Sequence, residues 1–223
     1  MIISIVIPAK GTSQRLENKN LLKIEGKSLV EMACEKVLKC KNIDNVYLDT
    51  ESQKVIECVD HLFSKGLKLI KRHNALADND TNANDLMVHA MHSISYCDLL
   101  LQTFCTSPLI KPETIDKAIE TFLLSKDHDG FITVVKTSEY FWDKSGKPEN
   151  FDINELPNSI NLPEKYIETH GLYGVFTKSL MLNKNRFGEK TLLVPISKNE
   201  SLDIDDPEDF ALLEAIKKNE ISE

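Results

Sequence analysis

Short apolar runs alternate with segments of helical periodicity along most of the chain. Strands are predicted where β-branched and other apolar residues cluster, at 2–7, 45–49, 67–70, 98–103, 130–135, 172–176 and 191–196. Helices are predicted where apolar residues recur every three or four positions, at 28–40, 52–63, 82–94, 111–124 and 207–219. Alternation of this kind predicts an α/β fold with a doubly wound, mostly parallel sheet, and the fully apolar early strands indicate helices on both faces.

Polar residues at the expected helix starts support these boundaries. Ser28 and Glu31 have the spacing of a capping box, in which each side chain binds the other residue's backbone N–H. Pro112 suits the first position of the helix at 111–124. Asp206 followed by Pro207 has the same form, with Asp206 as the N-cap of the last helix.

The alternation breaks between residues 137 and 170, a polar stretch with three of the eight prolines and the only tryptophan. We interpret it as a small inserted arm on a single domain spanning residues 1–223. A plain surface loop is the alternative. The stretch nevertheless carries Tyr140, Phe141, Trp142 and Phe151, and aromatic side chains favour interfaces, so a homodimerisation arm is expected.

Composition narrows the possible partners. The net charge of −8 and a pI near 5.3 argue against general nucleic-acid binding, which needs broad cationic surface. No stretch approaches the roughly 20 apolar residues of a membrane span, and residues 1–10 lack the features of a signal peptide. Five cysteines without a C-x-x-C pair indicate free thiols in a reducing compartment, so a cytoplasmic location is expected.

The segment IPAKGTSQRLENKN, at 7–20, gathers cations and small residues immediately after the first predicted strand. In open α/β sheets, ligands bind beyond the carboxyl ends of strands, and small residues let backbone N–H groups approach an anion. Neither a Walker P-loop nor a dinucleotide-binding glycine pattern is present. On composition alone a solvated loop is favoured; the alternative is a nucleotide-phosphate site formed by Ala9, Lys10, Gly11, Thr12, Ser13, Arg15 and Lys19.

A second polar motif, SLDIDDPEDF at 201–210, holds five carboxylates. The helix start accounts for three of them and leaves Asp203 and Asp205. Two positions apart in an extended segment, these side chains share a face, with Cα atoms roughly 6.5 Å apart. Two carboxylates on one face suit Mg²⁺, which prefers oxygen ligands and usually keeps waters and substrate phosphates.

The opening segment resembles the N-terminal signature of the cytidylyltransferases that make CMP-activated sialic acids and CMP-Kdo. The positions that match are Pro8, Ala9, Ser13, Arg15, Leu16, Lys19 and Asn20. The positions that depart from the signature are Lys10, Thr12, Gln14 and Glu17, so positive charge is kept at 10, 15 and 19 but not at 14. Similarity to this family continues in the same order at 45–52, 72–91, 105–119, 169–176 and 201–210.

The resemblance implies a nucleotide-diphospho-sugar transferase-like fold and transfer of CMP from CTP to a sialic-acid-like sugar acid, with release of pyrophosphate. It implies catalytic roles for Lys19, Arg15 and Asp203, with Asp203 and Asp205 as the Mg²⁺ ligands. Residues expected to contact the acceptor are Gln102, Phe104, Thr106, His170 and Tyr173, although core packing is an equal alternative for the tyrosine.

Other functions were also considered. The acceptor could be a sugar phosphate or phosphonate, the nucleotide base could be other than cytosine, or the chain could be a catalytically silent nucleotide-binding homologue. A glycosyltransferase is disfavoured, because the Asp-x-Asp motifs before the C-terminal segment, at 78–80 and 127–129, do not directly follow a predicted strand. All nucleotidyltransferase interpretations require the basic loop and the late aspartate pair to converge in space.

Overall fold

The computed structural model describes residues 1–13, 15–78 and 80–220. Gln14, one of the departures from the family signature, lies outside this part of the chain, as do residues 221–223 of the predicted domain. Seven strands form one central sheet, in the order β5 (Leu67–Lys71), β4 (Asn45–Thr50), β1 (Ile3–Pro8), β6 (Leu99–Gln102), β8 (Lys165–Phe176), β7 (Gly130–Thr137) and β9 (Thr191–Pro195). Only β8 runs against its neighbours, which confirms the mostly parallel sheet.

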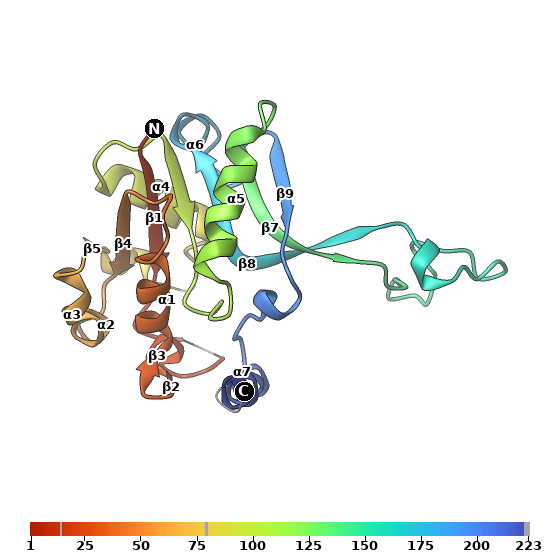
Figure 1. The fold of residues 1–223 in the computed structure, drawn as a ribbon, viewed down its shortest axis with the longest axis horizontal. Coiled ribbons are helices and arrows are strands. Elements are labelled where there is room, and N and C mark those ends of the chain that lie inside the picture. The colour runs from red at the N-terminus through yellow and green to blue at the C-terminus, as the bar shows by residue number, and fades with distance from the viewer. Residues whose placement is uncertain (14, 79, 221–223) are drawn as a thin grey trace.

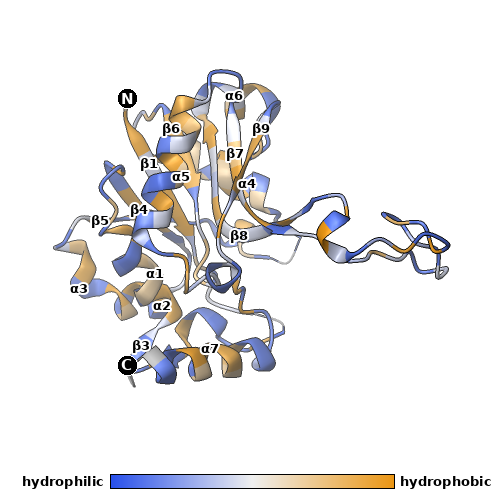
Figure 2. Ribbon diagram, turned by 45° about the vertical axis from the view of Figure 1, so that its right-hand side comes forward, coloured by the Kyte–Doolittle hydropathy of each residue, from blue (hydrophilic) through white to orange (hydrophobic). Residues whose placement is uncertain are grey.

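Helices cover both faces of this sheet (Figure 1). On one face the buried core joins the sheet to α1 (Leu29–Val37), α2 (Gln53–Cys58), α3 (Asp60–Phe63), α5 (Pro112–Leu124) and α7 (Pro207–Glu220). On the other face it joins the sheet to α4 (Ala83–Ser93) and α6 (Thr177–Asn183). Strand periodicity makes this possible: Ile5 and Ile7 of β1 pack in the first core and Val6 in the second. Figure 2 shows the apolar strands between these layers.

The predicted helix starts are confirmed, with two differences in the elements themselves. Ser28 and Glu31 form the capping box, and Pro112 occupies the start of α5. The predicted helix at 52–63 is split, because Val59 leaves the helical conformation with φ −113°. Helix α6 was not predicted, since its seven residues are too few to show a periodicity.

Short elements complete the connections. A two-stranded hairpin of β2 (Lys23–Ile24) and β3 (Lys27–Ser28) leads into α1, turning at Glu25 and Gly26, which both have positive φ. The 3₁₀ turns are η1 (Lys19–Leu21), η2 (Asn74–Leu76), η3 (Ser159–Asn161) and η4 (Asn199–Ser201). Among the helices that the structure describes, none has both the length and the hydropathy needed to cross a bilayer.

The segment predicted as an arm extends away from the body as the continuation of β7 and β8 (Figure 1). Its aromatic residues pack on one another: the rings of Tyr140 and Trp142 each lie 5.0 Å from that of Phe151, centroid to centroid. Much of its exposed apolar surface is therefore aliphatic, led by Ile160, Leu156 and Ile153 at 83%, 65% and 61% exposure.

Candidate active site

A cavity of about 390 Å³ opens at the carboxyl ends of the parallel strands. Loops that follow β1, β5 and β6 form its walls, joined by β8 and by the segment before α7. The predicted residues that line it are Lys10, Thr12, Ser13, Arg15, Lys19, Phe104, Thr106, His170, Asp203 and Asp205. The required convergence of the basic loop with the aspartate pair is thus confirmed.

The basic loop is held close to the end of β4. The backbone N–H of Gly11 donates to Oε1 of Glu51 at 2.7 Å, and Nδ2 of Asn20 donates to the carbonyl of Lys10 at 2.9 Å. A Cβ atom at Gly11 would lie 2.6 Å from Cβ of Ser52, so the loop's approach to β4 requires glycine here. These contacts fix the loop's base and leave the cationic side chains along the cavity.

Two of those cations meet one aspartate. Nη1 of Arg15 lies 2.8 Å from Oδ2 of Asp205, and Nζ of Lys19 lies 3.1 Å from its Oδ1. The Arg15 side chain is 71% exposed, whereas that of Lys19 is only 16% exposed. Lysine 19 therefore occupies a fixed position in the wall, and Arg15 forms the outer rim.

Asp203 lies deeper and has different partners. Its Oδ2 is 2.8 Å from Nδ1 of His170, and the Thr106 side chain also hydrogen-bonds to it. Burial alone would raise the pKa of Asp203, but the hydrogen bonds from His170 and Thr106, with nearby positive charge, lower it instead. The same hydrogen bond raises the pKa of His170 against the opposing effect of burial. Asp203 is therefore held as a carboxylate.

The aspartate pair fits a hard divalent cation. Oδ1 of Asp203 is buried and has no hydrogen-bond partner in the described structure, so one carboxylate oxygen remains available. Asp205 supplies a second carboxylate at the same cavity, at present paired with Arg15 and Lys19. Oxygen donors of this kind are those Mg²⁺ takes, together with substrate phosphates.

Four predicted contact residues do not line the cavity. The Ala9 N–H donates to the carbonyl of Asp49, and the Gly11 N–H is bound by Glu51, so neither backbone donor is offered to a phosphate. Gln102 and Tyr173 are fully buried. Burial raises the pKa of Tyr173, and its hydroxyl donates to Glu168. Packing in the core, the alternative considered for this tyrosine, describes its place in the structure.

Sequence analysis missed the cationic floor of the cavity. Arg72 follows β5 directly and is buried, with Nε and Nη2 each 3.0 Å from an oxygen of Asp49. Asp78 and Thr81 line the wall near α4. Arg72 lies just after a predicted strand, and this position could have indicated a role in the site. The segment 72–91 was compared with the family, but no role was assigned to the arginine.

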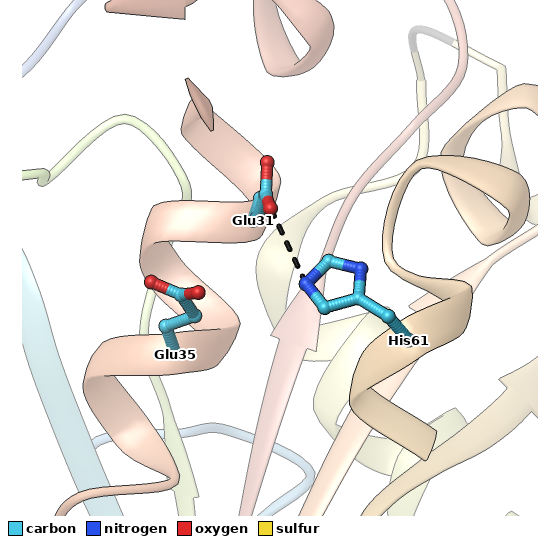
Figure 3. Close-up of side chains that lie close together, drawn as sticks. All are labelled: Glu31, Glu35 and His61. Carbon is cyan, nitrogen blue, oxygen red and sulfur yellow. Dashed lines mark ion pairs between the residues drawn. The ribbon is translucent and has the colours of Figure 1, made fainter. Parts of the chain in front are cut away.

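A second group of titratable side chains lies on the outer surface of α1 and α3 (Figure 3). The carboxylates of Glu31 and Glu35 and the ring of His61 approach within 4.8 Å of one another. Each carboxylate already has a structural partner, since Glu31 closes the capping box and Glu35 pairs with Lys27. We interpret this group as part of the helix surface.

Comparison of the sequence with known families identifies the family of this chain. A family profile described as cytidylyltransferase matches residues 4–222. The chain belongs to the cytidylyltransferase family. A curated CMP-N,N'-diacetyllegionaminic acid synthase from Legionella pneumophila is 26% identical over 97% of this chain and 96% of that protein.

Other cytidylyltransferases match less of their own length. A 3-deoxy-manno-octulosonate cytidylyltransferase from Thermodesulfovibrio yellowstonii is 25% identical over 62% of this chain and 54% of that protein. An N-acylneuraminate cytidylyltransferase from Escherichia coli O18:K1:H7 is 24% identical over 97% of this chain and 53% of that protein. This cytidylyltransferase chain therefore spans about half the length of those two relatives.

Solved structures share the fold of this cytidylyltransferase. A CMP:2-keto-3-deoxy-manno-octonic acid synthetase complexed with CTP superposes with a TM-score of 0.71, 17% identity, and coverage of 99% of this chain and 100% of that chain. A 4-diphosphocytidyl-2C-methyl-D-erythritol synthase from Anaerococcus prevotii gives a TM-score of 0.70 and 15% identity, covering 97% and 96% of the two chains. These likenesses support the nucleotide-diphospho-sugar transferase-like fold.

Proposed function

We propose that this cytidylyltransferase transfers CMP from CTP to a nonulosonic, sialic-acid-like sugar acid and releases pyrophosphate. The observation that carries the proposal is the meeting of Lys19 and Arg15 with Asp203 and Asp205 in one cavity. Cations for a triphosphate and carboxylates for a metal are the two charge sets that nucleotidyl transfer needs. The near full-length similarity to a legionaminic acid synthase supports the acceptor class.

In this proposal the acceptor hydroxyl attacks the α-phosphorus in line and pyrophosphate leaves. Lys10, Arg15 and Lys19 bind the phosphates and stabilise the charge that develops on them. Asp203 and Asp205 would hold Mg²⁺, which would neutralise phosphate charge when bound. Because Arg15 and Lys19 already bind a carboxylate, a phosphate is an alternative anion for the same donors.

The acceptor would occupy the part of the cavity beside β6 and β8. Phe104 and His170 line this part, and their rings lie 6.1 Å apart, edge to face. Thr106 lies next to both and binds Asp203. An aromatic ring against a histidine suits the face of a sugar ring. Both acceptor classes present such a ring, so the similarity to a legionaminic acid synthase is what favours a sugar acid.

Pyrophosphate release tests the proposal. The enzyme is assayed with CTP, ATP, GTP and UTP against N,N'-diacetyllegionaminic acid, N-acetylneuraminic acid, 3-deoxy-manno-octulosonate and a panel of sugar phosphates, with Mg²⁺ or with EDTA. We expect release only with CTP, Mg²⁺ and a sugar acid. Pyrophosphate release only with a sugar phosphate would show that the acceptor is a sugar phosphate. No release with any combination of nucleotide and acceptor would indicate a catalytically silent nucleotide-binding homologue.

We also propose that the protein is a homodimer joined through the arm. The exposed aliphatic residues Ile153, Leu156 and Ile160 have little to pack against within the chain. Light scattering on a size-exclusion column should give twice the chain mass for the wild type and the single-chain mass for Ile160→Glu/Leu156→Glu. A monomeric wild type at micromolar concentration would contradict the proposal.

A further inference from the structure

A buried arginine lies behind the acceptor end of the cavity. Arg186, in the loop between α6 and β9, is 8% exposed. Its guanidinium carbon is 3.6 Å from the ring centroid of Tyr173, 5.2 Å from that of Phe187 and 5.7 Å from that of Phe104. We call this group of three rings around Arg186 the arginine box. Phe104 lines the cavity as well, so one ring separates the box from the cavity.

The charge in the box is poorly compensated. Nη2 of Arg186 is 3.4 Å from Oε1 of Glu168, an oxygen that already accepts the Tyr173 hydroxyl at 2.6 Å. The Glu168 side chain is 41% exposed, so water weakens its attraction further. A buried guanidinium normally has a close, preferably bidentate, carboxylate partner. The Asp49–Arg72 pair of this same protein has that geometry, and Arg186 does not.

A second donor, the amide nitrogen of Gln102, lies beside the arginine box and has no hydrogen-bond partner among the described residues. Oε1 of Gln102 accepts from Nη1 of Arg186 at 3.0 Å, and this contact assigns the orientation of the amide. Nε2 of Gln102 is then buried with no hydrogen-bond partner among the described residues. An unpaired buried amide donor is unfavourable, and a bound group that accepts its hydrogen bond would remove this cost. Two adjacent donors, one charged and one unpaired, are suited to an anion.

The surrounding structure holds Arg186 in place before any ligand binds. Its backbone N–H donates to Oδ1 of Asn84, in the first turn of α4, at 3.0 Å. Further along the loop, the N–H groups of Glu189 and Lys190 donate to Asp129 at 2.9 and 2.7 Å. The loop is thus attached to both α4 and the start of β7, which preorganises the guanidinium.

We propose that Arg186 and Gln102 bind the carboxylate of the acceptor, with Phe104 as the ring that turns aside to admit it. This inference rests on the proposed function, because it assumes a sugar acid as the acceptor. It assigns specificity to the box: a planar carboxylate matches a guanidinium plus an amide donor, whereas a neutral sugar leaves both donors unpaired. A purely structural role, in which Arg186 braces Tyr173, is the competing explanation.

The test compares the best acid of the acceptor panel with its C1 carboxamide in the wild type, Arg186→Met and Arg186→Lys. Removing one partner of a buried charge pair should raise KM for the acid by about 30-fold or more in Arg186→Met. KM for CTP should stay within about twofold, and Arg186→Lys should recover part of the loss. The wild type should strongly prefer the acid to the carboxamide, and Arg186→Met should lose that preference. Lys178→Met, which removes an exposed cation of α6 outside the box, is the matched control.

The outcomes separate the two levels of the proposal. Unchanged preference for the acid in Arg186→Met overturns the carboxylate site while the wild-type activity upholds the proposed function. Equal increases in KM for acid, carboxamide and CTP, with a lowered Tm, show a structural brace and overturn it as well. Turnover of none of the sugar acids by the wild type removes the proposed function and this inference with it.

Discussion

Two arginine–aspartate pairs lie at the carboxyl ends of the same sheet and differ chiefly in burial. In the buried pair, the side chains of Arg72 and Asp49 are 2% and 0% exposed, and the guanidinium binds both carboxylate oxygens. In the rim pair, the side chains of Arg15 and Asp205 are 71% and 34% exposed, and a single nitrogen makes the contact. The two pairs therefore have similar nitrogen–oxygen distances, 3.0 and 2.8 Å, but differ in burial and in the number of hydrogen bonds.

The comparison shows which charges the protein can exchange. Separating the buried pair would leave a desolvated charge without a partner, so Arg72 and Asp49 must stay together through the catalytic cycle. The rim pair is solvated and weak, so Arg15 can leave Asp205 for a phosphate at little cost. Burial fixes Arg72 in the lining of the cavity, and exposure leaves Arg15 able to change partners, as the proposed function requires.

The largest expected effect comes from breaking the buried pair. Arg72→Met should lower the free energy of unfolding by about 3–5 kcal/mol, because it leaves Asp49 buried and uncompensated. Urea denaturation at pH 7 measures this. In the double variant Asp49→Leu/Arg72→Met much of the loss should be recovered. A loss below about 1 kcal/mol in Arg72→Met would show that water reaches Asp49 and that the two pairs do not differ.

Lys19, the wall cation that shares Asp205 with the rim pair, should show the opposite pattern, with activity lost and stability kept. Lys19→Ala should raise the activation free energy by about 2.7–4 kcal/mol, a loss of about 10²–10³ in kcat, because it removes a donor to the developing phosphate charge. Steady-state pyrophosphate release measures the loss, and the free energy of unfolding should change by less than about 1 kcal/mol. Near wild-type turnover would show that Lys19 serves only Asp205.

The same contrast explains what the sequence could predict of the site. Arg15, Lys19, Asp203 and Asp205 lie in short polar motifs that follow a strand or precede a helix. Composition alone favoured a solvated loop for Arg15 and Lys19, and the family resemblance indicated all four. Arg186 sits in a loop with no periodicity. Its partner Gln102 is 84 positions away, and only the antiparallel pairing of β6 with β8 brings Tyr173 beside them. A contact of that range has no signature in a single sequence.

The strands of the sheet also differ in how well the sequence predicted them. The parallel half of the sheet was predicted almost residue for residue, because β1, β4 and β6 are almost entirely buried and mostly apolar. β8 begins at Lys165, well before the predicted 172, since its first residues belong to the exposed arm and are mostly polar. A hydrophobic pattern indicates burial, so it cannot predict a strand whose residues lie outside the core.

A third carboxylate, that of Asp129, sharpens the comparison because its hydrogen-bond donors are uncharged groups. Asp129 accepts hydrogen bonds from Ser179 and from the N–H groups of Glu189 and Lys190. Burial alone would raise its pKa, but these bonds lower it. A carboxylate with a depressed folded pKa stabilises the fold above its unfolded pKa, about 3.9, and loses that contribution as pH falls through the folded pKa.

Asp129→Asn should therefore cost about 1–2 kcal/mol of unfolding free energy at pH 7, since it weakens charge-assisted hydrogen bonds but keeps one acceptor oxygen. Urea denaturation at a series of pH values measures the difference between wild type and variant. That difference should shrink as pH falls below about 4, where the Asp129 carboxyl of the unfolded chain takes up a proton, and should vanish below the lowered pKa of the folded state. A constant difference across the series would mean that the charge of Asp129 contributes nothing.

The smallest effect is expected at the outer surface of α1, where Lys27 pairs with Glu35. Glu31 and His61 lie close to Glu35 there (Figure 3). Side-chain exposures of 51% and 22% place this pair with the rim pair, although neither residue lines the cavity. Lys27→Met should leave both the midpoint of urea denaturation and pyrophosphate release essentially unchanged, because an exposed pair contributes little. A loss of stability comparable to that of Arg72→Met would contradict this prediction. It would show that side-chain exposure does not distinguish ion pairs that can change partners from those that stabilise the fold.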